Sequence, residues 1–400
     1  MSKPSIPLKV LIPVLAMLSA FAPVATDMYL PGLSLMTEVF QTTTGRVQAT
    51  ISVFFLGLAI GQSIYGPLID RFGRKPPLLV GVGLYVLASL ACMWVTDIGW
   101  FIAMRFLQAV GGAAGMLIGR AIINDLFDRT ETARVLSLMM MVIILAPILA
   151  PIAGGWLVVN VSWQSIFAVM LVFGVVCLLL VVFLIPETLP PGHRQELGFG
   201  RVVHTYAQLL TRPAFAIPAL CGALAQSCMF AYITGSEFVF TQLYGLSAQQ
   251  YGWLFALNAA GIIVATNGNR FSLKRWPIER IFTAALVANA VFAAALVLLA
   301  SSPSLWWFVL PLWLLIGTLG FIGANAAAIA MSASGRTAGS GSGLIGVMQF
   351  GMAFAVSGTV AATQNGTAYP MALTMLVCST AACVLWFGTR RRMASSAQPR

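Results

Sequence analysis

Long apolar runs alternate with short polar segments along the whole chain. Each run covers about 20 residues, the length that an α-helix needs to cross the hydrocarbon part of a bilayer. The runs lie at 9–31, 47–69, 77–95, 99–121, 134–158, 164–185, 214–239, 250–267, 280–300, 305–330, 342–362 and 368–388. This pattern predicts an all-α membrane protein with twelve transmembrane helices.

The composition agrees with the pattern. Of the 400 residues, 59% are hydrophobic and only 8% are charged, and the mean hydropathy is +0.92. A chain with so few polar side chains has no way to bury its apolar surface in one water-soluble core. A multi-pass membrane protein is the class that remains.

One connecting segment, residues 187–212, is long and polar. It is expected to be a cytoplasmic linker between two six-helix bundles, residues 1–186 and 213–400. Such duplicated bundles are typical of transporters whose substrate site lies between the halves. A trace of duplication is visible, because the loops GPLIDRFGRKP at 66–76 and NGNRFSLKRWP at 267–277 are both basic and turn-rich, although the second lacks the acid.

The basic residues predict the orientation, because Lys and Arg in short loops stay on the cytoplasmic side. With the N-terminus inside, all but two of the 22 lie in cytoplasmic loops, tails or helix ends. The exceptions are Arg46, near the outer surface, and Arg105, inside a span. Both termini are therefore expected in the cytoplasm. The net charge of +11 follows from this topology and requires no nucleic-acid partner.

Two charged residues, Asp27 and Arg105, lie inside apolar spans. A charge placed there costs at least a few kcal/mol, so such residues usually face a cavity, a partner or a proton path. Asp27 lies toward the outer half of the first span, where a cavity can connect it with water. It is the first candidate for a proton carrier. The alternative is a carboxylate that caps a helix end or pairs structurally with a cation.

Arg105 lies about two turns from the outer end of the fourth span. Its permanent charge would favour the ionised form of a nearby acid until substrate or movement separated them, which would exchange binding for a proton. The alternative is structural, with the guanidinium bonded to backbone carbonyl groups of a broken helix. Gln108, one turn later, can hold the guanidinium. Glu237, near the outer end of the seventh span, is either a second functional acid or a residue at the membrane surface.

Several segments resemble a known family. Residues 66–75 resemble the loop signature of the major facilitator superfamily, residues 105–112 the helix 4 motif of its proton-coupled members, and residues 146–155 the helix 5 antiporter motif. Further likeness to the Bcr/CflA group of bacterial drug:proton antiporters comes from TDMYLP at 26–31, SWQSIF at 162–167 and PETLPP at 186–191. The likeness is thinner in the C-terminal half, where Glu237 stands in place of an expected proline.

The resemblance implies that the loop after the second span is a cytoplasmic gate, a latch that holds one side closed. Setting the topology alone is its other possible role. Gly66 is expected to permit close helix packing and Gly73 a tight turn. Asp70 can accept hydrogen bonds from a helix N-terminus or from Arg. The residues expected to anchor the loop at the inner surface are Arg71, Arg74 and Lys75.

The helix 5 segment contains Pro147, Pro151, Gly154 and Gly155. Proline removes backbone hydrogen bonds and glycine permits close approach, so this helix should bend and pack tightly on a neighbour. The resemblance implies a seal against passive leak, while a kinked packing helix is the alternative.

Motifs for bond-making chemistry are missing from the sequence. No metal-ligand cluster, activated nucleophile or phosphate-binding loop is present, so we expect neither an enzyme nor a cofactor. The resemblance implies a monomeric exporter in the bacterial inner membrane that exchanges small drug-like molecules, of bicyclomycin, amphenicol or sulfonamide type, for protons by alternating access. A proton-coupled exporter of a metabolite such as a purine or an amino acid is the alternative.

Overall fold

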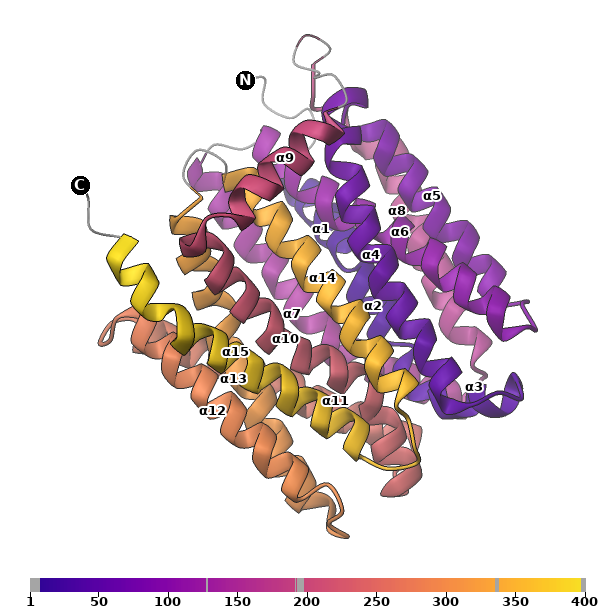
Figure 1. Ribbon diagram of the computed structural model, residues 1–400. Coiled ribbons are helices and arrows are strands. Elements are labelled where there is room, and N and C mark those ends of the chain that lie inside the picture. The colour runs from indigo at the N-terminus through magenta and orange to yellow at the C-terminus, as the bar shows by residue number, and fades with distance from the viewer. Residues whose placement is uncertain (1–7, 127–128, 191, 193–197, 335–337, 397–400) are drawn as a thin grey trace. The chain divides into compact units, whose positions relative to one another are not determined.

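The computed structural model describes residues 8–126, 129–190, 192, 198–334 and 338–396, and all regular structure in these ranges is helical (Figure 1). The chain divides into two units, which are described separately. The first consists of Met1–Phe199 with Leu246–Ala256, and the second of Gly200–Gly245 with Leu257–Arg400.

The first unit is built around α6, which packs against α4 and α5, while α7 packs against α1 and α2. Its elements are α1 (Leu8–Ser19), α2 (Phe21–Asp27), η1 (Leu30–Gly32), α3 (Leu33–Val39), α4 (Thr44–Phe72), α5 (Lys75–Cys92), α6 (Ile98–Leu126), α7 (Arg129–Asn160) and α8 (Gln164–Leu184).

The first apolar run forms a broken helix. The segments Leu11–Ser19 and Phe21–Val39 meet at an angle of 44°. Two prolines explain the interruptions, because proline has no N–H for the carbonyl four residues earlier. Pro23 removes the bond to the Ser19 carbonyl, and Pro31 the bond to the Asp27 carbonyl. The chain around Asp27 is therefore only seven residues of α-helix followed by a short 3-10 turn.

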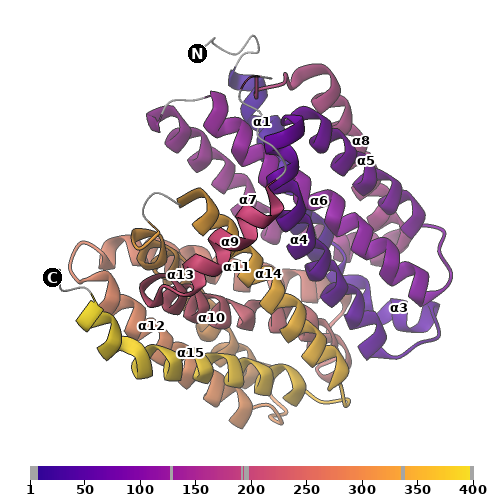
Figure 2. The same cartoon turned by 45° about the horizontal axis from the view of Figure 1, so that its top comes forward.

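The second unit is built around α10, which packs against α13, α14 and α15, and Figure 2 shows α12 beside α15. Its elements are α9 (Phe199–Leu210), α10 (Pro213–Phe238), the π-helical turn η3 (Val239–Leu243), α11 (Ala248–Ser272), α12 (Ile278–Leu298), α13 (Leu305–Ser332), α14 (Ala338–Ala362) and α15 (Tyr369–Ser396). The first residues of α11, up to Ala256, belong to the first unit.

Helix α9 lies in the segment that sequence assigns to the linker, and it docks on the second unit. Its apolar positions recur at helical spacing, which gives it one apolar face. Leu209 on that face is buried with Phe215 and Leu344, and Tyr206 packs against the same cluster. The apolar face thus fastens α9 to α10 and α14.

Each of the twelve apolar runs falls on helix. By length and composition, nine helices of the described chain can cross a membrane, or ten when the bent first pair counts as one span. Within α7, only Leu145–Asn160 is found as an apolar helix, and it is shorter. The protein is an all-helical multi-pass membrane protein, and twelve spans stay a prediction.

Candidate functional site

Arg105 is the centre of the polar interior of the first unit. Its side chain is completely buried, although it carries a permanent charge. Nη2 donates a hydrogen bond of 3.0 Å to the backbone carbonyl of Ala25, and Nη1 donates one of 2.5 Å to Oε1 of Gln108. The guanidinium therefore joins α6 to α2, in the broken first helix.

Three aromatic rings surround the same guanidinium. Its central carbon lies 4.4 Å from the ring centroid of Tyr29, 4.5 Å from that of Phe54 and 5.8 Å from that of Phe167. The negative faces of aromatic rings attract a cation, and this attraction is stronger where water is excluded. Arg105 is thus held inside the unit by rings and neutral acceptors, and no carboxylate of the described residues bonds to it.

Gln108 is held in turn by its own partners. It is completely buried, and Nε2 donates to Oγ of Ser89 at 2.7 Å and to the sulfur of Met170 at 3.5 Å. The Ser89 hydroxyl donates to the carbonyl of Tyr85. This chain of hydrogen bonds fixes the amide so that its oxygen faces Arg105, as sequence spacing predicted.

Asp27 is the last residue of α2, two positions after the carbonyl that Arg105 binds. Only 4% of its surface is exposed, and its carboxylate has no hydrogen bond or ion pair with any residue that the structure describes. The expected contact between Asp27 and Arg105 is not made here. Arg105 instead binds the backbone of the helix that carries Asp27.

The glycines of helix α7 pack on the same broken helix. A methyl group on Gly154 would overlap the carbonyl oxygen of Met28, the residue after Asp27. One on Gly155 would lie 2.7 Å from the Ala248 carbonyl oxygen, in the part of α11 that belongs to this unit. The tight packing predicted for the helix 5 segment is therefore present, and it abuts the helix break directly.

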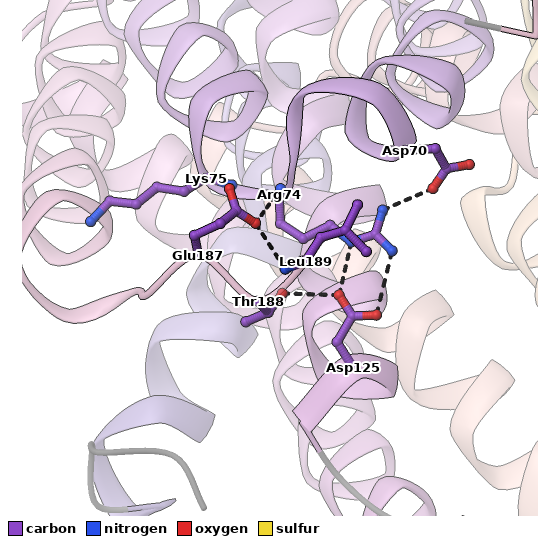
Figure 3. Close-up of polar contacts among 7 residues, drawn as sticks. All are labelled: Asp70, Arg74, Lys75, Asp125, Glu187, Thr188 and Leu189. Atoms are coloured by element: carbon purple, nitrogen blue, oxygen red, sulfur yellow. Dashed lines mark hydrogen bonds and ion pairs between the residues drawn. The ribbon is translucent and has the colours of Figure 1, made fainter. Parts of the chain in front are cut away.

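A second polar cluster lies where α4 turns into α5 (Figure 3). Arg74 donates from Nη1 to Asp70 at 2.9 Å and from Nε to Asp125, near the end of α6, at 2.8 Å. Burial lowers the pKa of Arg74, but its hydrogen bonds and the charges of Asp125 and Asp70 outweigh this and raise the pKa above its usual value. Arg74 thus stays charged and joins α4 to α6.

Glu187 binds the beginning of α5 from the chain that follows α8. Its carboxylate accepts hydrogen bonds from the backbone N–H groups of Arg74 at 2.8 Å and Lys75 at 3.2 Å (Figure 3). These are free N–H groups at a helix start, where a negative charge is favoured. Gly73 permits the approach, since its φ is 93° and a Cβ there would overlap the carboxylate.

Thr188 and the side chain of Lys75 complete this cluster, which we call the Arg74 latch. Thr188 donates to Asp125 at 2.9 Å, and Nζ of Lys75 donates to the Val182 carbonyl at 2.8 Å. The latch consists of Asp70, Arg74, Lys75, Asp125, Glu187 and Thr188. Sequence reasoning found the first three in one motif but assigned no contact to the others.

Of the predicted gate residues, Gly73 borders the latch, whereas Gly66 and Arg71 lie outside it. Arg71 is exposed and lies over the ring of Phe72, 5.2 Å from its centroid. The close helix packing expected at Gly66 is wrong for the described residues, because no atom from another described helix lies within 4 Å of where its Cβ would be.

Glu237 is buried within the second unit. It is 2% exposed and lies one residue before the end of α10, just ahead of the π-helical turn. Thr241, one turn later, donates to its carboxylate at 3.2 Å. Glu237 is thus packed among helices, and both roles considered for it, a second functional acid or a residue at the membrane surface, stay predictions.

Comparison with known proteins decides the family. The family model of the Major Facilitator Superfamily matches residues 15–358. The chain belongs to the major facilitator superfamily. The D-xylose-proton symporter, a solved member structure, has the same fold, with a TM-score of 0.76 at 13% identity over 95% of this chain and 97% of that one.

Relatives of known sequence indicate which group of the superfamily the chain belongs to. It is 32% identical to an uncharacterised MFS-type transporter, YdgK of Bacillus subtilis, over 95% of each chain. It is 30% identical to the bicyclomycin resistance protein homolog of Haemophilus influenzae, over 91% of this chain and 92% of the relative. The superfamily member is therefore a transporter of the Bcr/CflA drug efflux group, as its motifs indicated, and not an enzyme.

Proposed function

We propose that this protein is a proton-coupled antiporter that exports small drug-like molecules and that Asp27 carries the proton. The observation that carries the proposal is the position of Asp27: buried, without a partner in the described chain, at a break in the first helix. An ionised carboxylate in such a place costs several kcal/mol unless water, a cation or a substrate reaches it. Its charge state therefore depends on which conformation the transporter adopts.

Arg105 has a positioning role in this proposal. Its hydrogen bond to Ala25 fixes the backbone there, its bond to Gln108 orients the guanidinium, and the interrupted helix then presents Asp27 at the same point in each cycle. The guanidinium also leaves a positive charge nearby that an anionic form of Asp27 can use when the helix shifts. Gln108 supports Arg105 and has no separate role.

The Arg74 latch is proposed as a gate on the cytoplasmic side. It joins the end of α4, the start of α5, the end of α6 and the chain after α8 through charge-assisted hydrogen bonds. Such bonds are lost together when one helix end moves, which favours two discrete states over gradual deformation.

The twelve-span topology and the cytoplasmic termini belong to the same proposal. Helices α7 and α11 have 32 and 25 residues, and at about 1.5 Å per residue both are long enough to span a bilayer. Polar residues of α11 have partners in the second unit: Asn258 donates to Tyr232, and Asn269 pairs with Asn325. We expect tags at both ends and in 187–212 to be inaccessible from outside intact cells.

The test uses purified protein in liposomes that contain a pH-sensitive dye. Wild-type protein should move protons when bicyclomycin, an amphenicol or a sulfonamide is added, whereas Asp27→Asn should show no drug-dependent proton movement, because the titrating group is gone. Asp97→Asn is the matched control, since Asp97 is exposed and only caps the start of α6.

Three outcomes separate the alternatives. Uphill export by Asp27→Asn would contradict the role of Asp27 and direct attention to Glu237. Export of a purine or an amino acid, with none of the drugs moved, would favour the metabolite exporter. Drug movement without protons in the wild type would remove proton coupling.

A further inference from the structure

The second unit contains a small cavity that no part of the coupling proposal uses. It has a volume of about 180 Å³ and lies among α10, α13 and α14. Its lining includes Gly222, Gln226, Gly323, Ile345 and Gln349. The remaining lining residues are alanines, and no charged side chain lines it within the described chain.

Close helix packing shapes one wall. A Cβ on Gly222 of α10 would lie 2.6 Å from the Cβ of Ala326 on α13, so the two helices leave no room for a side chain there. Gly323, one turn earlier on α13, faces Gln226 instead: its Cβ would lie 3.5 Å from Nε2 of the amide. The absent side chain at Gly323 leaves the cavity beside the Gln226 amide.

The Gln226 amide has an unused hydrogen-bond acceptor. Its Oε1 is buried, and no residue that the structure describes bonds to it. Most buried polar side-chain atoms have at least one partner, and leaving one without a partner is costly. Gln349, on α14, lines the same cavity and provides a second carboxamide. Two amides beside one uncharged void indicate a polar guest.

The chemistry of the guest follows from these groups. A carboxamide offers one acceptor and two donor hydrogens, so it is complementary to a group with an N–H donor beside a carbonyl acceptor. Amides, lactams and related rings have such an edge. A charged group is disfavoured, because the described lining has no counter-charge.

The size of the cavity limits what enters. Pockets that enclose whole drug-sized ligands have volumes of roughly 300–1,000 Å³. At about 180 Å³ this cavity takes one ring or side group of a larger molecule. Its lining residues lie between the start and the middle of α10 and of α14 and toward the end of α13.

We propose that Gln226 and Gln349 form a subsite that binds a neutral amide or lactam group of the exported molecule. The proposal rests on the proposed function in one respect only, namely that the ligand is transport substrate. Gln226 Oε1 accepts from the ligand N–H, and the Gln349 amide donates to the ligand carbonyl.

Binding of three small probes tests this subsite without a proton gradient. The probes are 2-piperidone, its N-methyl derivative and δ-valerolactone, which share one ring size and differ in the N–H group. Saturation-transfer NMR with the purified protein gives their relative affinities. We expect the wild type to prefer 2-piperidone over both analogues by about tenfold, because the analogues leave the buried acceptor unpaired.

Two variants locate the preference. Gln226→Leu keeps most of the side-chain volume but has no acceptor, so its tenfold preference should fall to about one. Gly323→Val fills the cavity beside the amide and should abolish binding of all three probes. Ser227→Ala is the control, because the Ser227 hydroxyl bonds the Ala223 carbonyl of its own helix and does not line the cavity. Melting curves of each variant show whether it is folded.

The result that overturns the subsite is equal binding of all three probes by the wild type, or a lactam preference that persists in Gln226→Leu and in Gln349→Leu. Absence of any probe binding would overturn it too and would mean that only water occupies the cavity. Failure of the coupling proposal looks different, since a protein that prefers the lactam but exports no drug keeps the subsite and loses the antiporter function.

Discussion

Among the described residues, only the first unit buries cations. In the first unit, the buried polar positions include the charged residues Asp27 and Arg105. In the second, buried amides and hydroxyl groups bond one another: Asn289 donates to Thr318 at 2.8 Å and accepts from Ser379 at 2.6 Å. Neutral groups can satisfy one another fully, whereas a buried charge stays sensitive to protons and to water.

This difference teaches where each task of a transporter can be carried out. A fixed neutral network stabilises helix packing and offers hydrogen bonds of constant strength. A buried charge responds to its surroundings. The proposals follow this division, with coupling in the first unit and recognition of a neutral group in the second. Glu237 is the exception, an acid buried in the second unit.

The largest effect is expected at Arg105. Arg105→Ala should destabilise the protein by about 2–5 kcal/mol, because it leaves the Ala25 carbonyl and the Gln108 amide unpaired and opens a void among three rings. Arg105→Lys keeps the charge but has no planar fork to hold both partners. Both variants should melt early and lose transport.

Arg46→Ala is the control for these melting curves, since Arg46 is exposed at the start of α4. Substantial transport by Arg105→Lys, with a shifted pH optimum, would show that transport needs the charge and not the hydrogen bonds to Ala25 and Gln108. Wild-type transport by Arg105→Ala would remove the residue from the mechanism.

A second effect of similar size should come from Asn289, in the neutral network. Asn289→Ala should lower the free energy of unfolding by about 2–3 kcal/mol, because Thr318 and Ser379 lose a buried partner. The variant that remains folded should retain the wild-type pH dependence of transport. Asn267→Ala, on the exposed face of α11, is the control. A changed pH dependence in Asn289→Ala would contradict the proposal that proton coupling depends on the first unit alone.

Gly154 offers a smaller test of the contact between α7 and the broken helix. Gly154→Ala should cost about 1–3 kcal/mol, because the methyl group displaces the Met28 backbone. Gly358→Ala is the control: its added methyl group meets no atom of another described helix within 4 Å, and alanine favours helix. Thermal unfolding measures both, and proton leak in liposomes tests the proposed seal. Equal melting temperatures would contradict the contact.

The smallest effect should come from Glu187 of the latch. Glu187→Gln can still accept one hydrogen bond but has no charge at the start of α5. The free energy of unfolding should therefore fall by about 0.5–1 kcal/mol. Glu279→Gln, which removes an exposed acid from the first turn of α12, serves as control. The rate of transport should change more than the melting temperature does; an unchanged rate would contradict a gating role.

Sequence pattern alone predicted the positions of the helices, because spans and their ends depend on local composition. It also predicted that Gln108 holds Arg105, which requires only helical spacing. It did not predict that Asp125 and Glu187 meet Arg74, since 51 and 113 residues separate these partners and no periodicity links them. Gln226 was missed for the same reason, because a cavity depends on which side chains of three helices are absent.

The broken first helix shows how a helix run can be predicted while its function-bearing detail is not. The apolar run at 9–31 indicated one span, and Pro23 and Pro31 were visible in it. Only the structure places the interruptions on either side of Asp27. The sequence thus predicts the span, but the position of the site depends on which backbone hydrogen bonds the prolines remove.

The hydrogen bonds between Glu187 and the start of α5 also define one end of the segment that connects the two units. The chain leaving α8 stays attached to the first unit as far as Leu189, whose N–H also bonds Glu187, and α9 is already fastened to the second unit through Leu209. Residues 190–198 connect these two attachment points, and a segment of nine residues spans at most about 30 Å when fully extended. This length is an upper limit on the distance between the two attachment points in any conformation of the transporter.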